Sequence, residues 1–364
     1  MEISRRLDHW IFDSYYVSPL FLGLCRMLYA GHILFLALEP SHWMGRFPSA
    51  FYEPPLSFAR LMGGFPPEAF FHVLNVLMVV GLVFLFLGVY TRYSSIGVFV
   101  VSLVYTTFAG CFGNILHSTL IIIIPLVMAF SNWGAGLSWD AIRGKGGEVE
   151  GWPISLLSVL IGFCMFTAGV WKWEWLDLET SGIQSNLLVN YYARERGDLL
   201  STFFVGIEVR WFWEVLDWVI VIFECLFLVV VFWPSWFRFW VSLAVLFHFA
   251  NVLMLNVDFN SFLLLYMFFI PWELVERLGS NTLKAVERYG EHFYGVLKVW
   301  HIALLIFGIL GVLYTHGSFY MLLMDLLGIE SRYVLPLSLF SISSVIVFFF
   351  WVYRIRLWFL GITK

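Results

Sequence analysis

A single lysine, Lys172, follows an uncharged run of 19 residues that begins at Pro153 and ends at Trp171. Trp171, Trp173 and Trp175 lie beside it in the sequence. An amine in an apolar, aromatic-walled site is more easily held neutral, and a neutral amine is a base. The alternative is that Lys172 extends its ammonium group to the membrane surface, where tryptophans also gather. The residue types therefore predict either a general base or an interfacial anchor.

Two further stretches contain polar side chains inside apolar segments. His117 follows Asn114 by three residues, and Asn251 follows His248 by three, so each pair would share one face of a helix. Ionisable groups inside spanning segments are costly and are candidates for a functional site. By the topology deduced below, both pairs fall at the membrane depth of Lys172, and we predict one shared site. For His117 the alternative is a buried histidine that is hydrogen-bonded between helices.

Arg26 and Glu224 are charged residues inside the first and sixth apolar segments. An isolated guanidinium in an apolar run needs a carboxylate, such as Glu224, or backbone carbonyl groups as partners. We predict a structural role for Arg26. Glu224 is expected to be either its counter-ion or a neutral, protonated acid.

The composition indicates a membrane protein. Of 364 residues, 61% are hydrophobic and 13% are charged, whereas soluble domains carry about 25% charged residues. The net charge of −4 and the lack of a basic patch exclude nucleic acid as an expected partner. The four cysteines form no CxxC pair, and no histidines are spaced as in helical metal sites, so no metal is indicated.

The apolar segments predict an all-α fold, a polytopic transmembrane bundle of about ten spanning helices, with a range of eight to ten. The segments lie near residues 17–38, 70–90, 93–112, 114–131, 153–172, 214–233, 236–256, 259–276, 293–315 and 334–353. The first one follows a polar start and contains Arg26, so we expect it to remain as a spanning helix and not to be cleaved as a signal peptide.

The distribution of positive charge predicts the orientation. The loops on the side of the N-terminus carry 12 lysines and arginines, against 7 on the other side. By the positive-inside rule both termini are then cytoplasmic, and Lys172 faces outside. The connections 42–67 and 177–213 lie outside as well and mix polar with apolar residues, which predicts an extracytoplasmic cap. A prokaryotic cytoplasmic membrane fits this arrangement.

Three of these stretches resemble a known family. TAGVWKW, which contains Lys172, NILHS, which contains His117, and the segment around His248 resemble stretches of the vitamin K-dependent gamma-carboxylases and of the wider horizontally transferred transmembrane (HTTM) domain proteins. Arg26 and the aromatic connection before the second segment also fit. The resemblance covers residues 10 to 275, so we expect a core domain at 1–276 and two additional helices at 277–364.

The resemblance implies a mechanism. The lysine that corresponds to Lys172 acts as a base on a reduced naphthoquinone of the vitamin K or menaquinol type. Oxygen then adds, and a strongly basic alkoxide removes a proton from a peptide glutamate, which takes up carbon dioxide. The histidine that matches His117 would stabilise developing charge. Asn114, His248, Asn251, Trp171 and Trp173 would line the ligand site.

Because the animal enzymes continue into a large luminal domain and this chain ends after two more helices, we expect quinol oxygenation, of the epoxidation type, or another proton abstraction, and not peptide carboxylation. The substrate would be a peptide or a small lipidic molecule. The alternative is a non-catalytic membrane protein, either a maturation or export helper for a secreted peptide or a small transporter.

Overall fold

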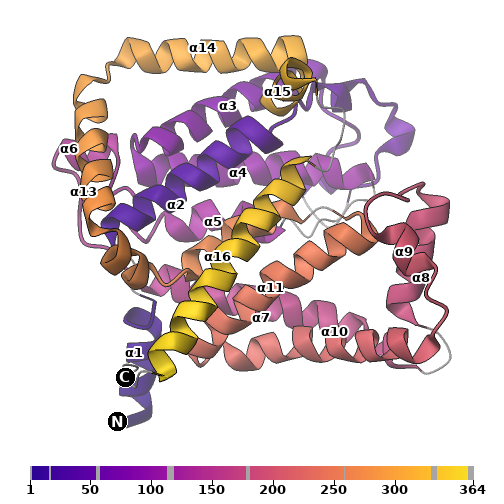
Figure 1. The fold of residues 1–364 in the computed structure, drawn as a ribbon. Helices are drawn as coiled ribbons and strands as arrows, with labels where there is room; N and C mark the ends of the chain where they lie inside the picture. The colour runs from indigo at the N-terminus through magenta and orange to yellow at the C-terminus, as the bar shows by residue number, and fades with distance from the viewer. Residues whose placement is uncertain are drawn as a thin grey trace. The chain divides into compact units, whose positions relative to one another are not determined.

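The computed structural model describes residues 2–15, 18–54, 58–112, 119–177, 181–257, 259–328 and 334–359. Every regular element within these ranges is a helix (Figure 1). The prediction of an all-α fold is therefore confirmed for the described residues. The chain divides into two compact units, Met1–Leu156 with Pro271–Glu330 and Leu157–Ile270 with Ser331–Lys364. The predicted division near residue 276 follows from the family resemblance and stays a prediction.

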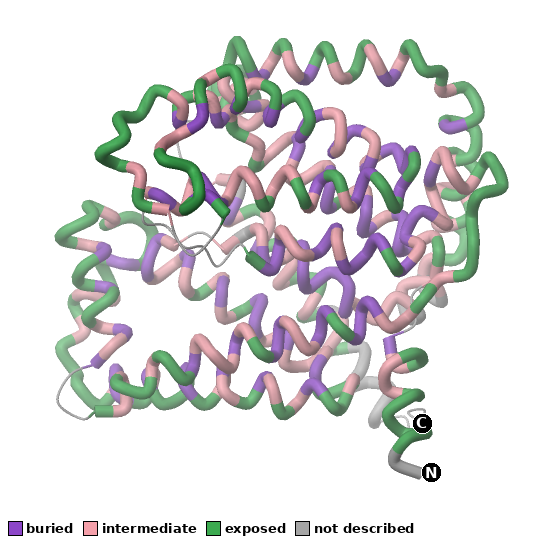
Figure 2. Tube along the Cα trace, turned by 180° about the vertical axis from the view of Figure 1, so that it is seen from behind, coloured by how far each residue is buried: buried purple, intermediate pink, exposed green. Residues whose placement is uncertain are grey.

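Six helical stretches among the described residues are long and apolar enough to cross a membrane, by length and composition. They are α2 with its continuation (Pro19–Ala37), α3 (Glu68–Leu87), α4 with its continuation (Thr91–Phe112), α7 (Trp152–Trp171), α11 (Pro234–Leu255) and α14 (Val299–His316). Two apolar helices are shorter: α5 (Thr119–Met128) and the stretch Pro336–Val352 of α16. Many helices bury one side and expose the other (Figure 2).

The first unit also contains α1 (Glu2–Phe12), α6 (Trp139–Ile142), α13 (Trp272–Val296) and α15 (Phe319–Leu327). The connection between α2 and α3 forms three short 3-10 helices, His42–Arg46, Ser49–Phe51 and Phe58–Leu61. Met44 and Ala59 of this connection are fully buried against Phe71 of α3 and Phe108 of α4. The connection is thus packed onto the helices through an apolar cluster.

Arg26 is fully buried in the first unit, where its guanidinium group donates hydrogen bonds to the carbonyl oxygen of Leu85 at 3.0 Å and to that of Leu137. Leu85 lies in the last turn of α3 and Leu137 in the turn before α6, where carbonyl groups lack the full set of helical donors. Gly88, which follows α3 with φ +67°, lies so close to Arg26 that a Cβ atom there would overlap the guanidinium group. The sequence predicts either a carboxylate or backbone carbonyl groups as partners of Arg26. The structure gives it carbonyl groups.

The second unit contains the C-terminal part of α7, η6 (Trp173–Leu176), α8 (Gly182–Leu188), η7 (Val189–Ala193), α9 (Ser201–Val205), α10 (Arg210–Val230), α11, α12 (Leu263–Tyr266) and α16 (Val334–Phe359). Two glycines bring α7 and α10 together. A Cβ atom on Gly162 would lie 2.5 Å from Val231, and one on Gly169 would lie 2.8 Å from the Cys225 sulfur. Small residues allow such close helix packing in membranes. Because Gly162 meets the end of α10 and Gly169 its middle, the helices are antiparallel.

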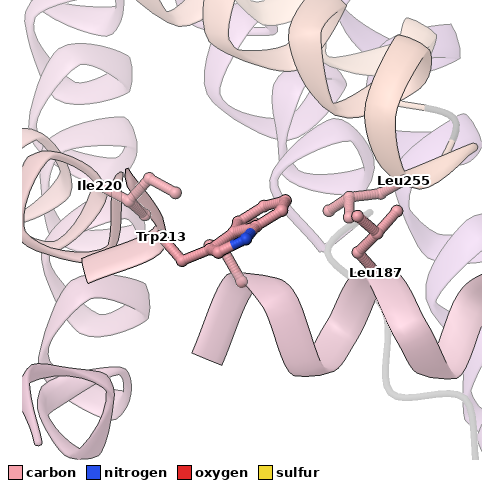
Figure 3. Packing of buried hydrophobic residues seen from close by; sticks show 5 residues of the cluster. Leu187, Trp213, Ile220 and Leu255 are labelled. Atoms are coloured by element: carbon pink, nitrogen blue, oxygen red, sulfur yellow. The ribbon is translucent and has the colours of Figure 1, made fainter. Parts of the chain in front are cut away.

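The connection between α7 and α10 is folded around an apolar cluster. Ile183 and Leu187 of α8 pack with Trp213 and Ile220 of α10 and with Leu255 of α11. Figure 3 shows the Trp213 ring between Ile220 on one side and Leu187 and Leu255 on the other. These contacts hold α8 against the start of α10 and the end of α11.

The α16 helix lies across α11 (Figure 1). Phe340 stacks on Phe249, with ring centroids 6.2 Å apart, and the indole N–H of Trp351 donates to the Ser242 hydroxyl at 2.9 Å. Since the later residue of α16 meets the earlier residue of α11, the two helices run antiparallel.

Two elements differ from the sequence prediction. The segment expected at 259–276 is not one helix: Asn260–Phe262, Leu263–Tyr266 and Met267–Phe269 form three short helical pieces, after which Pro271 precedes another helix. Together they reach only about 15–20 Å, less than the hydrocarbon thickness. The pattern of apolar runs does not predict α13, because charged residues such as Lys284 and Arg288 interrupt every run. The apolar residues between them nevertheless recur with helical spacing.

Replacing Arg26 should destabilise the protein strongly. In an Arg26→Met variant the buried carbonyl groups of Leu85 and Leu137 lose the guanidinium donors, which should lower the free energy of unfolding by about 3 kcal/mol. Thermal unfolding of the purified protein in detergent measures this loss. Arg5→Ala, at an exposed position of α1, is the matched control and should unfold as the wild type does. Equal unfolding midpoints for both variants would contradict the structural role.

Candidate functional site

Lys172 is paired with a buried carboxylate. Its ammonium group donates to both oxygens of Glu224, and the side chains are 24% and 4% exposed, respectively. The Lys172 Nζ atom also lies 5.4 Å from the centroid of the Trp175 ring. The side chain therefore turns toward α10 and does not extend away from the protein as an interfacial anchor would.

The local fold explains this pairing. The α7 helix ends at Trp171, and Lys172 precedes the short 3-10 helix that contains Trp175. Gly169, one turn earlier, contacts Glu224 and Cys225 of α10, so the end of α7 is held against the middle of α10. A long lysine side chain at this point reaches the carboxylate one residue before Cys225. In apolar surroundings a charged group is tolerated only with such a partner.

His248 forms a second polar pair in the same unit. It is buried on α11, and its Nε2 atom lies 2.8 Å from the hydroxyl oxygen of Tyr266; the tautomer decides which group donates. The rings of Phe247, Phe259 and Phe262 lie with centroids 4.8–5.3 Å from the imidazole centroid. The imidazole is therefore enclosed by aromatic rings and directed to one hydroxyl group.

The two pairs belong to one polar region. The Glu224 carboxylate lies within electrostatic range of the side chains of Tyr266 and Cys164. Tyr266 contacts His248, and Glu224 contacts Lys172, so the two pairs lie near each other in the second unit. Nothing in the sequence pattern indicates Tyr266, because a tyrosine in an apolar run is usually a packing residue. Only its contact with His248 identifies it.

The remaining predicted site residues have different positions. Asn114 and His117 lie outside the described residues. Asn251 is half-buried on α11, one turn after His248. Trp171 and Trp173 are 86% and 71% exposed, so Trp175 supplies the ring beside the ammonium group. Lys172 lies between the end of α7 and the 3-10 helix that begins at Trp173, and in this turn the side chains on either side of it are directed to the surface.

The α10 helix carries three carboxylates on its buried face, at Glu214, Asp217 and Glu224. Their spacing of three and seven residues places them on one side of the helix. Asp217 is fully buried and accepts hydrogen bonds from the Ser181 hydroxyl at 2.6 Å and from the backbone N–H groups at the start of α8. Glu214 lies 3.6 Å from Arg210. Of the three, only Glu224 is predicted from the sequence, although the i, i+3, i+10 spacing could have indicated all of them.

No group of three or more histidine, cysteine, aspartate or glutamate side chains among the described residues is arranged to hold a metal ion. The polar region of the second unit instead combines an amine, a carboxylate, a phenol and an imidazole. These groups can accept, donate and relay protons. Searches against protein-family models, curated proteins and solved structures found no match to the chain.

A Glu224→Gln variant should release Lys172. The amide cannot balance the ammonium charge, so the protein should lose about 1–3 kcal/mol of stability, less than a fully buried pair because Lys172 is partly exposed. Lys172 should also react faster with an amine-directed reagent, as measured by mass spectrometry of the labelled peptide. Glu214→Gln on the same helix is the control and should leave the labelling rate of Lys172 unchanged. An unaltered rate in Glu224→Gln would contradict the pairing.

Proposed function

We propose that this chain is a multi-span membrane enzyme of the HTTM and gamma-carboxylase type, in which Lys172 acts as a base on a reduced quinone. The observation that supports the proposal best is the contact of the Lys172 amine with the buried carboxylate of Glu224. An interfacial anchor needs no such partner, whereas a proton-transfer site needs a second group that can exchange a proton with the amine.

The pair can supply a neutral amine without leaving an isolated charge. In apolar surroundings a proton can pass from the Lys172 ammonium to the Glu224 carboxylate, which gives two neutral groups. The free amine can then accept a proton from a quinol hydroxyl group. A reduced quinone bound here would supply the acidic hydroxyl group, and the protonated Lys172 would carry the positive charge that balances the loss of that proton. Each state therefore has balanced charges, as a site with little water requires.

The His248 and Tyr266 pair fits a supporting role. Its hydrogen bond fixes the imidazole ring, and Tyr266 lies within electrostatic range of Glu224. A phenol or an imidazole can donate to oxygen atoms that gain negative charge. In our proposal Asn114 and His117 contribute from the region that the resemblance assigns to them, and Trp171, Trp173 and Asn251 contact outer parts of the ligand.

The ligand that we propose is a reduced naphthoquinone, with molecular oxygen as the co-reactant and a small or lipidic molecule as the substrate. Peptide carboxylation is not part of the proposal. The enzyme class would be that of an oxidoreductase or lyase with epoxidation-type chemistry.

We also propose about ten membrane crossings. To the six candidate helices we add α5, α16 and α10. The three carboxylates of α10 disfavour a span by composition, but all lie on its buried face. Its other face exposes apolar side chains from Trp211 to Val229, a length of about 27 Å, which matches the hydrocarbon core.

The tenth crossing follows from the ends of neighbouring elements. Within the second unit, Asn256 at the end of α11 donates to the carbonyl groups of Arg196 and Asp198 in the connection that we assign to the outside. Within the first unit, Trp272 stacks on Phe21 at the start of α2, which we assign to the inside, with ring centroids 4.3 Å apart. In our proposal the chain between Asn256 and Trp272 changes sides, with extended residues adding to the short helical pieces, which alone do not span the hydrocarbon. Both termini are then cytoplasmic, and the site and its cap are outside.

Replacing Lys172 should strongly reduce oxygen consumption. We expect purified protein with reduced menaquinone to consume oxygen, and Lys172→Ala and Lys172→Arg to reduce the rate by about 100-fold or more, because general-base catalysis contributes that much. An oxygen electrode measures the rate. The control is Lys284→Ala, at an exposed position of α13.

The non-catalytic alternative makes the opposite prediction. If Lys172→Arg behaves as the wild type does and mass spectrometry of extracted lipids finds no quinone with the purified protein, the base assignment is wrong. The chain would then be better described as an export or maturation helper or as a transporter, in which Lys172 and Glu224 only stabilise helix packing.

The topology can be tested with single cysteine substitutions in intact cells. A membrane-impermeant maleimide should label Arg194→Cys in the connection before α10, and it should label Lys145→Cys only after the membrane is opened. Both positions are exposed. Labelling of Lys145→Cys in intact cells would reverse the proposed orientation.

A further inference from the structure

The first unit contains a cavity whose lining includes none of the candidate-site residues. Its volume is about 190 Å³, and it is lined by Thr91, Arg92, Ala129, Phe130, Asn132, Trp133 and Gly134. A single water needs only about 10–15 Å³ of such volume, so the cavity can hold a group of several atoms. It lies where α4 begins and where the chain leaves α5.

Arg92 gives the cavity a positive charge. Within the described part of the chain the Arg92 guanidinium makes no ion pair, and it lies 5.1 Å from the centroid of the Phe130 ring. The carboxylate of Asp140 is close to this end of α4, but it accepts from the backbone N–H groups of Tyr90 and Thr91 and from the Thr91 hydroxyl group. Asp140 thus occupies the helix start, and Arg92 keeps its donors for a ligand.

The backbone of the cavity lining adds further donors. For the N–H groups of Asn132 and Gly134, no backbone acceptor is found in the described ranges. Asn132 adopts a left-handed conformation with φ +57°, and its side-chain amide donates to the Glu148 carbonyl at 3.0 Å, which fixes this turn. Successive N–H groups around such a residue form concavities that bind anions.

The cavity lies at the ends of apolar helices, which indicates that an anion bound there would come from a lipid headgroup. The α3 helix ends at Leu87, α4 begins at Thr91 and α5 ends at Met128, so three apolar helices have one end at this level. Phe130 and Trp152, with ring centroids 5.9 Å apart, add aromatic rings there. Aromatic residues concentrate at the interface between hydrocarbon and water, where phospholipid phosphate groups lie.

We propose that this cavity, with Arg92 as its charged group, binds a phosphate group, and that the ligand is the headgroup of an anionic phospholipid. Arginine binds phosphate through two parallel N–H donors, which a single lysine cannot do. The Phe130 ring holds the guanidinium at the cavity, and the backbone N–H groups of Asn132 and Gly134 are placed to contact the remaining oxygen atoms. This site does not depend on the proposed enzyme activity.

The test is a thermal-unfolding titration of the full chain in detergent with three probes: phosphatidylglycerol, diacylglycerol with the same acyl chains, and inorganic phosphate. We expect phosphatidylglycerol to raise the unfolding midpoint at concentrations where diacylglycerol does not. The Arg92→Ala variant should need about tenfold more phosphatidylglycerol for half of the effect, which corresponds to the loss of one charge-assisted contact. Arg143→Ala, which removes an exposed cation that packs on Trp139, should not alter the titration.

The outcomes separate the sources of the phosphate. A response to inorganic phosphate that equals the response to phosphatidylglycerol supports the anion site but assigns it to a soluble phosphate ester. Equal stabilisation by diacylglycerol, or an unchanged titration in Arg92→Ala, overturns the proposal. If Arg92→Ala does not fold, Arg92→Lys replaces it: this variant keeps the charge, loses the two-donor contact and should show a smaller but measurable loss of affinity.

Discussion

The ion pair between Lys172 and Glu224 is the interaction on which the second unit depends. Two charged groups in an apolar chain are stable only when each compensates the other, because separate burial would cost several kcal/mol for each ion. Their contact requires α7 and α10 to approach closely, which Gly169 permits beside Glu224. The close packing of α7 and α10 and the charge balance of Lys172 and Glu224 therefore depend on each other. A larger residue at Gly169 would separate both the helices and the ions.

The α10 helix also contacts α8 and α11, so it links the ion pair to the rest of the second unit. Its buried carboxylates have different partners: Asp217 holds the start of α8, and Glu224 holds Lys172. The apolar cluster around Trp213 adds the end of α11 to the same assembly. One face of α10 supplies all of these contacts, and the other face is apolar and exposed.

The first unit uses a buried charge differently. Arg26 is held by backbone carbonyl groups, with the hydroxyl group of Tyr294 nearby, and its guanidinium group stays protonated, so it fixes chain ends and exchanges no proton. Lys172, by contrast, has a carboxylate partner and lies in a region with Tyr266 and His248. Both cations need a partner. With carbonyl groups as its partners, Arg26 is structural, whereas Lys172 has a carboxylate partner and belongs to a candidate proton-transfer site.

The sequence by itself determined the helical class, most of the apolar helices and the identity of the rare polar residues within them, because the length of apolar runs and the cost of buried charge are local properties of the chain. It did not determine α13, whose charges interrupt the apolar runs, or the broken helix around Tyr266. The partners were decided only by the tertiary structure. Lys172 and Glu224 are 52 residues apart, and the rotation of each helix selects Trp175 over its neighbours as the ring beside the amine. Such pairings depend on how the helices pack against each other, and the spacing of residues within one segment does not determine that packing.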